Sequence, residues 1–194
     1  TKPVSSARLA GMLADKGIFA APTLAASYRA FQRQAAGGKV GIRAGAIPFA
    51  TRQKNASMLR EAGIRVVVGT DAGASLCRFD EAVHVEMEAL VGAGWTPVEA
   101  IHAGTLGSAT AVGVEKTLGS LEAGKLADVV VVRGNPARSI SDVRQVEAVY
   151  LNGRRVASRG HATLDERPTP WPESAIATRT EYRSTDVGPR LPKA

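Results

Sequence analysis

The 194-residue sequence has little of several features that define whole classes of protein. A single cysteine, Cys77, excludes a framework of internal disulfides and fits a reducing compartment. No apolar run approaches the roughly 20 residues of a membrane-spanning helix. The start, Thr1-Lys2-Pro3, has neither an initiator Met nor the charged-then-apolar pattern of a signal peptide. We therefore expect a cytoplasmic protein without a membrane partner, whose chain is processed, excised or incomplete.

Acidic residues are scarce in the first third of the chain. Residues 1–70 contain 11 Lys or Arg against 2 Asp or Glu, and the formal net charge of the whole chain is +7. An excess of cations can indicate nucleic-acid binding. Here the cations lie several residues apart, and Tyr28 and Phe31 are the only aromatics in their densest part. The pattern favours solvated helix faces, or a surface that meets an acidic partner or a missing part of the same protein, and we predict no nucleic-acid partner.

Two stretches repeat the order helix, glycine and short apolar strand. A helix to about Lys16 is followed by Gly17 and a strand within 18–24 that ends at Pro22 or just beyond it, and a helix at 48–62 is followed by Gly63 and a strand at 64–68. Strands that are apolar on both faces are typical of a parallel sheet covered by helices. Further helices are predicted around 28–34, at 79–93, and from Thr96 through small residues to 112.

The pattern changes after Gly119. Strands are predicted at 126–132, at 146–151 and from residue 154, and Asn152-Gly153 between the last two is typical of a type I′ hairpin. From Arg159 onward the chain is rich in Pro, Thr, Ser and Arg, which predicts an extended tail.

The stretch VVVGTDAG, residues 66–73, carries the strongest candidate for chemistry. A buried strand here delivers the carboxylate of Asp71 at its C-terminal end, which is where catalytic groups gather in (β/α)8 enzymes. Such a carboxylate can bind a metal ion and take a proton from the attacking water. It can equally cap a helix or satisfy a turn, and this stretch alone does not separate these alternatives.

The sequence that follows resembles the amidohydrolase superfamily. EMEALVGAGWTPVEAI (86–101) is similar to a helix pair of that family, and GSLEAGKLADVVVV (119–132) is similar to its return strand. The Asn135-Pro136 turn and the hairpin VYLNGRRV (149–156) follow in the family's order. LADKGIFAAPTL (13–24) resembles the stretch between the sixth and seventh barrel strands, most of all in the imidazolonepropionase-like and prolidase-like branch.

The resemblance implies an α/β fold: the C-terminal part of a (β/α)8 TIM-type barrel plus part of a small antiparallel β-domain, a composite β-sandwich. Residues 1–118 would form the last βα units of the barrel. Residues 119–158 would form strands and the hairpin of the small β-domain, and residues 159–194 an extended tail.

The resemblance also implies a metal-dependent hydrolase acting on an amide or cyclic C–N bond of a small-molecule substrate. Asp71 matches the Asp that ends the eighth barrel strand, contacts the metal and acts as general base toward the metal-bound water. One or two divalent ions, most often zinc, would polarise the carbonyl and activate that water. Thr70, Ala72, Gly73 and His84 would lie in the substrate pocket.

The sequence departs from the family in its other metal ligands. The H-x-H pair of the first strand, the mid-barrel carboxylated Lys or Glu, and the His residues ending the fifth and sixth strands are absent. The three histidines, His84, His102 and His161, close no strand-like run, and none is placed to activate Cys77. Zinc takes three or four protein ligands at about 2 Å, so one carboxylate does not hold it. We therefore expect the isolated chain to bind no metal and to be inactive.

Two hypotheses stay open. In the first, this is the C-terminal portion of an amidohydrolase and requires the missing N-terminal barrel half or another copy of the chain. In the second, it is a non-catalytic remnant kept for binding or assembly. About three strands of an eight-stranded barrel leave exposed edges that favour association, so we expect a homo-oligomer.

Overall fold

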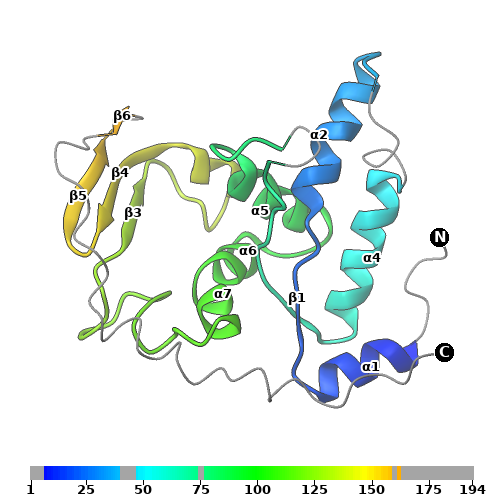
Figure 1. Cartoon of the computed structure of the whole chain (residues 1–194), viewed down its shortest axis with the longest axis horizontal. Helices are drawn as coiled ribbons and strands as arrows, with labels where there is room; N and C mark the ends of the chain where they lie inside the picture. The colour runs from blue at the N-terminus through cyan, green and yellow to red at the C-terminus, as the bar shows by residue number, and fades with distance from the viewer. Residues whose placement is uncertain (1–6, 40–46, 74–76, 159–160, 163–194) are drawn as a thin grey trace.

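A computed structural model describes residues 7–39, 47–73, 77–158 and 161–162, which form a helical part and an antiparallel sheet (Figure 1). The helices are α1 (Ala7–Asp15), α2 (Leu24–Ala35), α4 (Phe49–Glu61), α5 (Ala82–Gly92), α6 (Pro97–Gly104), α7 (Leu106–Ala111) and the 3-10 helix η1 (Ile140–Arg144). The strands are β1 (Phe19–Ala20), β2 (Arg65–Val66), β3 (Val129–Val132), β4 (Val146–Leu151), β5 (Arg154–Ser158) and β6 (His161–Ala162). No helix within the described ranges has the length and apolar character needed to span a membrane.

The predicted parallel pairing of the first two strands is confirmed, but the strands are short. β1 pairs with β2 in parallel, with Ala20 opposite Val66, and the amide of Val67 donates to the carbonyl of Ala20 at 3.0 Å. The predicted strand at 18–24 is too long at its end. Thr23 adopts a left-handed backbone with φ of 51°, and α2 begins at the next residue.

The predicted helices are present with three changes in their bounds. The helix predicted around 28–34 begins earlier, at Leu24. α5 begins at Ala82 rather than at Phe79, because the residues before it form a turn. The helix predicted from Thr96 to residue 112 is divided into α6 and α7 at Thr105, whose φ of −123° and ψ of −100° are not helical. α6 starts with a capping box, in which the Thr96 side chain accepts from the Glu99 amide at 3.2 Å and the Glu99 carboxylate accepts from the Thr96 amide at 2.7 Å.

Two hydrophobic clusters hold the helical part together. The buried members of the large core are Leu24, Ala56, Ala89, Leu90, Ala93, Trp95, Ala100, Ala103, Ile140 and Val143. Those of the small core are Ala25, Cys77, Ala82 and Val85, against which Ala26, Tyr28 and Ala72 pack. The large core joins α2, α4, α5, α6 and η1, and Val66 and Val68 pack against it, so these helices cover the parallel strands.

β3, β4, β5 and β6 form the antiparallel sheet in that order. Asn152 and Gly153 between β4 and β5 have φ values of 49° and 76°, the two positive φ angles of the predicted type I′ turn. β3 begins at Val129 rather than at Leu126, because Asp128 turns its carboxylate to the Asn152 amide, which donates to Oδ1 at 2.7 Å. β6 adds two residues of the predicted tail to the sheet, and residues 163–194 lie outside the described part.

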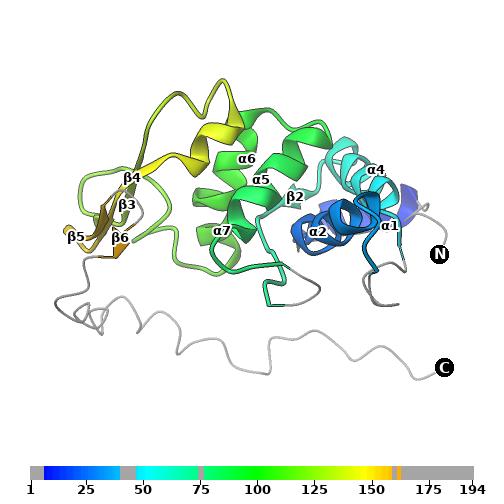
Figure 2. The same cartoon turned by 90° about the horizontal axis from the view of Figure 1, so that it is seen from above.

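The antiparallel sheet lies at one end of the molecule, and α1 and α4 lie at the other (Figures 1 and 2). η1 crosses back from the sheet to the helices, where Arg144 forms an ion pair with Glu88 of α5 at 2.6 Å. In Figure 1, α2 continues in the direction in which β1 runs, so it stands beyond the C-terminal end of that strand.

Candidate active site

Asp71 lies on the segment between β2 and α5, beyond the C-terminal end of the parallel strands. This segment passes close to the one that follows β1, since a Cβ on Gly69 would lie only 2.8 Å from the Cβ of Ala21. Glycine is therefore required at this crossing. Asp71 follows a parallel strand as expected, but β2 is shorter and less buried than predicted: it ends at Val66, Arg65 is exposed and Val66 is half-buried. The role of Asp71 stays a prediction.

The backbone of Asp71 presents its carboxylate to solvent. Its φ of 52° lies in the left-handed region, which Asp tolerates better than most residues with a side chain. The residue is exposed, and its carboxylate forms no hydrogen bond or ion pair with another described residue. No helix begins at Asp71, because α5 starts only at Ala82, so the alternative of a helix cap is not realised.

The neighbours of Asp71 hold the conformation of the loop. The Thr70 hydroxyl accepts from the Ala72 amide at 3.2 Å, and the Gly73 amide donates to the carbonyl of Cys77 at 2.8 Å. Gly73 has a φ of 90°, which a residue with a side chain adopts only with strain. Three of the residues predicted to line the pocket therefore shape the loop itself.

Cys77 connects this loop to the small core. It is 3% exposed and packs in one cluster with Ala25, Ala82 and Val85. Burial raises the pKa of its thiol, and the negative charges of nearby glutamates add to that effect. A thiol held in its protonated form is a poor nucleophile, and the role of Cys77 stays a prediction.

Glu86 of α5 is a buried carboxylate that the sequence analysis did not single out. It is fully buried, and its Oε2 accepts from the amide of Ala25, at the start of α2, at 2.6 Å. Burial raises the pKa of Glu86 to about 7, although hydrogen bonds from the Ala25 and Leu24 amides oppose the rise. The helical spacing of the sequence indicates that Glu86 is buried, because it lies on the apolar face of α5 that also carries Ala82 and Leu90.

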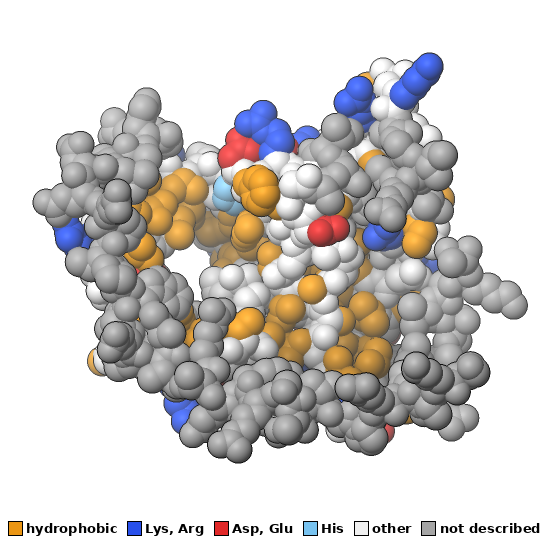
Figure 3. Space-filling model, in the orientation of Figure 1, with side chains coloured by type: hydrophobic (Ala, Val, Ile, Leu, Met, Phe, Trp, Pro, Cys, Tyr) orange, Lys and Arg blue, Asp and Glu red, His pale blue; other side chains and the backbone are white. Residues whose placement is uncertain are grey.

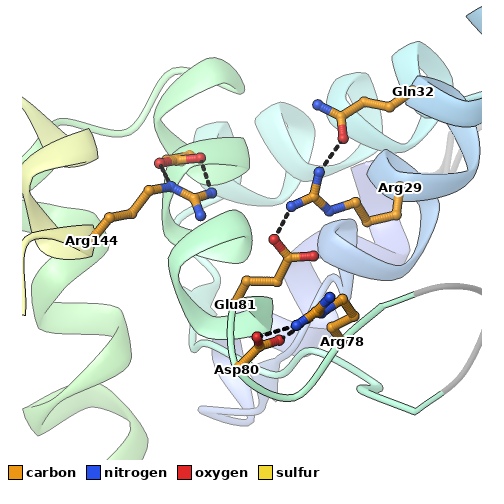
Figure 4. A network of polar contacts seen from close by, with 7 residues as sticks. Arg29, Gln32, Arg78, Asp80, Glu81 and Arg144 are labelled. Atoms are coloured by element: carbon orange, nitrogen blue, oxygen red, sulfur yellow. Dashed lines mark hydrogen bonds and ion pairs between the residues drawn. The ribbon is translucent and has the colours of Figure 1, made fainter. Parts of the chain in front are cut away.

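A shallow cleft of about 480 Å³ lies between α2 and the turn before α5, lined by Arg29, Gln32, Arg33, Arg78, Asp80 and Glu81. Most of its charges are paired with one another (Figure 4): Arg29 binds Glu81 and the Gln32 amide oxygen, and Arg78 binds Asp80 at 2.5 Å. Basic and acidic side chains also lie together at the upper edge of the space-filling view (Figure 3). Because Arg29 and Arg78 are paired with acidic side chains, the cleft offers little positive charge to bind a polyanion.

The three histidines lie on three different elements. His84 is half-buried in α5, and its pKa is lowered first by burial and then by the charge of Arg144. His102 lies in the last turn of α6, and His161 lies in β6 opposite Ser158. The pocket role predicted for His84 stays a prediction.

The described donors do not form a metal site by themselves. Within the described ranges, no group of three or more His, Cys, Asp and Glu side chains is arranged to hold a metal ion. Asp71 supplies an exposed carboxylate, and no other described residue joins it in such a group. A structural metal site would require at least three or four such ligands, so an ion bound here needs donors from elsewhere.

Comparison with known proteins identifies the family. The Amidohydrolase family pattern matches residues 12–156, which is most of the chain. An imidazolonepropionase of Geobacillus kaustophilus (strain HTA426) is 32% identical over 165 residues, which are 82% of this chain and 38% of that protein. A 5-methylthioadenosine/S-adenosylhomocysteine deaminase of Moorella thermoacetica (strain ATCC 39073 / JCM 9320) is 34% identical over 124 residues, which are 54% of this chain and 29% of that protein.

The fold agrees with the sequence match. The crystal structure of a Xaa-Pro dipeptidase with bound methionine in the active site superposes with a TM-score of 0.68 at 26% identity. The superposition covers 79% of this chain and 38% of that one, so the chain spans well under half the length of its relatives. The chain belongs to the amidohydrolase family, whose enzymes generally depend on divalent metal ions.

Proposed function

We propose that this chain is the C-terminal portion of a metal-dependent amidohydrolase that hydrolyses an amide or cyclic C–N bond, and that Asp71 belongs to its catalytic centre. The single observation that carries the proposal is the placement of Asp71. Its carboxylate is exposed and unpartnered among the described residues, on the loop beyond the C-terminal end of a parallel strand. In barrel enzymes this is the end at which catalytic groups gather.

The proposed roles of Asp71 are to bind a divalent ion, most often zinc in this family, and to take the proton of the attacking water. The ion, when bound, would polarise the scissile carbonyl and activate that water. The left-handed conformation of Asp71 and the hydrogen bonds of the Ala72 and Gly73 amides support the backbone on which the carboxylate is carried. The substrate class follows from the family alone, and the substrate itself stays open.

The remaining ligands must come from outside this chain. β1 and β2 form a sheet of two strands, with no further partner among the residues that the structure describes. Their free edges support pairing with the remaining barrel strands, which would come from an N-terminal barrel half or from another copy of the chain. Size-exclusion chromatography with light scattering tests pairing with another copy of the chain. A well-folded monomer at all concentrations would contradict such pairing.

Substitution of Asp71 by Asn tests the catalytic role. The variant is compared with the parent protein in an enzyme that combines this chain with the remaining barrel strands, using dipeptides, N-acyl amino acids and cyclic amides as substrates. We expect kcat to fall by about 10²–10⁴-fold, the usual worth of a general base, with a lower content of divalent metal. Asp15→Asn, at an exposed position in α1, is the matched control and should leave both unchanged.

Two further results would separate the alternatives. The isolated chain should show neither stoichiometric metal nor hydrolysis, whereas the combined enzyme should show both and lose activity to a chelator. A combined enzyme that binds no divalent metal, or an Asp71→Asn variant that hydrolyses at the parent rate, would contradict the proposal. The first of these results would support the non-catalytic remnant instead.

A further inference from the structure

We infer that Glu86 is a positioning residue, whose buried carboxylate ties α5 to the start of α2 and thereby fixes the loop that carries Asp71. The inference deepens the proposed function, since Asp71 is the residue it would position. It is carried by three features of the described structure: the cap that Glu86 supplies to α2, its one unsatisfied oxygen, and the small core between Glu86 and the Asp71 loop.

Glu86 supplies the N-terminal cap that α2 lacks in its own sequence. Thr23, the residue before α2, is left-handed and makes no side-chain hydrogen bond to the helix, and no acidic residue lies in the first turn. The Glu86 Oε2 instead accepts from the Ala25 amide at 2.6 Å, across 61 residues of sequence. A carboxyl oxygen at a helix N-terminus satisfies a backbone amide that has no partner within the helix.

The other oxygen of Glu86 has no hydrogen-bond partner. Oε1 is buried and unpaired among the described residues, and the whole side chain is excluded from solvent. No ion pair to Glu86 is found among the described residues, and its negative charge contributes to the raised pKa of the Cys77 thiol. A buried carboxylate with one unsatisfied oxygen is costly when ionised, so the contact between α2 and α5 depends on its protonation.

The small core carries this contact to Asp71. Ala25, whose amide Glu86 holds, packs in the same cluster as Cys77 and Val85, and Ala72 packs against that cluster. Ala72 is the residue after Asp71, and the Cys77 carbonyl accepts from the Gly73 amide at 2.8 Å. If α2 separates from α5 at Glu86, the cluster loses Ala25, and the support under Ala72 is lost with it.

The single cysteine makes the inference measurable without enzyme activity. Cys77 is 3% exposed and lies in the small core, so its labelling rate reports how often that cluster opens. The full chain is labelled with a dipyridyl disulfide, which reacts with thiols at acidic and neutral pH, and each rate is divided by that of the unfolded chain. Far-UV circular dichroism follows the helices in parallel, so that local opening is distinguished from global unfolding.

Glu86→Ala should raise the normalised labelling rate of Cys77 at least tenfold while the helical signal stays intact. Glu88→Ala is the matched control: it removes a carboxylate two residues along the same helix, one that binds Arg144 rather than α2, and should change the rate less than twofold. Equal rates in the Glu86→Ala and Glu88→Ala variants would overturn the inference.

Glu86→Gln keeps the shape and one acceptor oxygen but does not ionise, so it tests the role even if Glu86→Ala fails to fold. The normalised rate of the parent chain should rise with pH up to about pH 7, where Glu86 ionises, and then level off. The rate in Glu86→Gln should stay low and flat across this range. A parent chain with no pH dependence, or the same dependence in Glu86→Gln, would contradict the inference whatever the outcome for Asp71.

Discussion

The helical part and the antiparallel sheet reach their structures by different kinds of contact. In the sheet, each strand pairs with the next strand in sequence, and β4 and β5 are joined by a two-residue turn. In the helical part, β1 and β2 pair over only two residues each, with α2 and α4 lying between them in sequence. The large core, rather than the strand ladder, holds that part together.

The candidate chemistry lies in the part that depends on contacts between distant residues. Asp71 and Glu86 both lie in the helical part, which depends on contacts between residues distant in sequence. Closing such contacts costs loop entropy, so the helical part should be the more sensitive to loss of buried side chains. β3 has exposed side chains at Val130 and Val131, which point to opposite faces of the sheet, and the sheet should be less sensitive at these positions.

The largest expected effect is that of Leu90→Ala in the large core. Leu90 is fully buried in α5, and its truncation removes apolar contacts and leaves a cavity, which costs about 2–5 kcal/mol. Urea unfolding followed by circular dichroism measures the loss. Val130→Ala in β3, where the side chain is 57% exposed, should change stability by less than about 0.5 kcal/mol. Equal losses in both variants would remove the contrast between the two parts.

The next largest effect is a dependence of stability on pH that originates in Glu86. Burial raises the pKa of Glu86 from 4.5 to about 7, so the folded chain binds this proton more tightly than the unfolded chain does. The contribution of Glu86 to stability is therefore greatest at low pH. It decreases as pH rises from about 4.5 to about 7, by up to about 1.4 kcal/mol per pH unit, and is constant above.

Urea unfolding at a series of pH values between 5 and 8 checks this slope. The difference in unfolding free energy between the parent and Glu86→Gln should vary with pH across this range. Parallel pH profiles for the parent and Glu86→Gln would show that the carboxyl of Glu86 ionises at the same pH in the folded and unfolded chains.

The smallest of the three effects belongs to the turn of the antiparallel sheet. Gly153 has a φ of 76°, so Gly153→Ala should destabilise the hairpin by about 1 kcal/mol through backbone strain alone, because the added Cβ would meet nothing closer than 3.8 Å. Gly11→Ala, inside α1 where nothing lies within 4 Å of the new Cβ, should instead stabilise by about 0.5–1 kcal/mol. If thermal unfolding showed that both variants shift the melting temperature in the same direction, backbone strain at Gly153 would not explain the effect in the turn.

Local sequence signals predicted the features that depend on neighbouring residues. The Thr96 cap of α6, the Asn152-Gly153 turn and the order of helices and strands are all set by such signals. The break at Thr105 was not predicted, because small residues on both sides favour one continuous helix. β1 ends at Ala20, two residues before Pro22, and the left-handed backbone of Thr23 that follows was not predicted, because Thr rarely adopts it.

The candidate site was predictable only in part for the same reason. Asp71 could be placed after a strand from the apolar run before it, and the family resemblance gave it a proposed role. The importance of Glu86 depends on the Ala25 amide, 61 residues away, and on complete exclusion of solvent. The spacing from Ala82 and Leu90 indicates burial, but the contact with the Ala25 amide is not visible in the local sequence, because it joins residues distant along the chain.

The most direct test of the central claim is a crystal structure of the combined enzyme grown with zinc, with the metal located by anomalous scattering. We expect a carboxylate oxygen of Asp71 at about 2.0–2.2 Å from the metal, beside ligands supplied by the remaining barrel strands. A bound metal whose coordination shell excludes Asp71 would contradict the assignment of this loop to the catalytic centre.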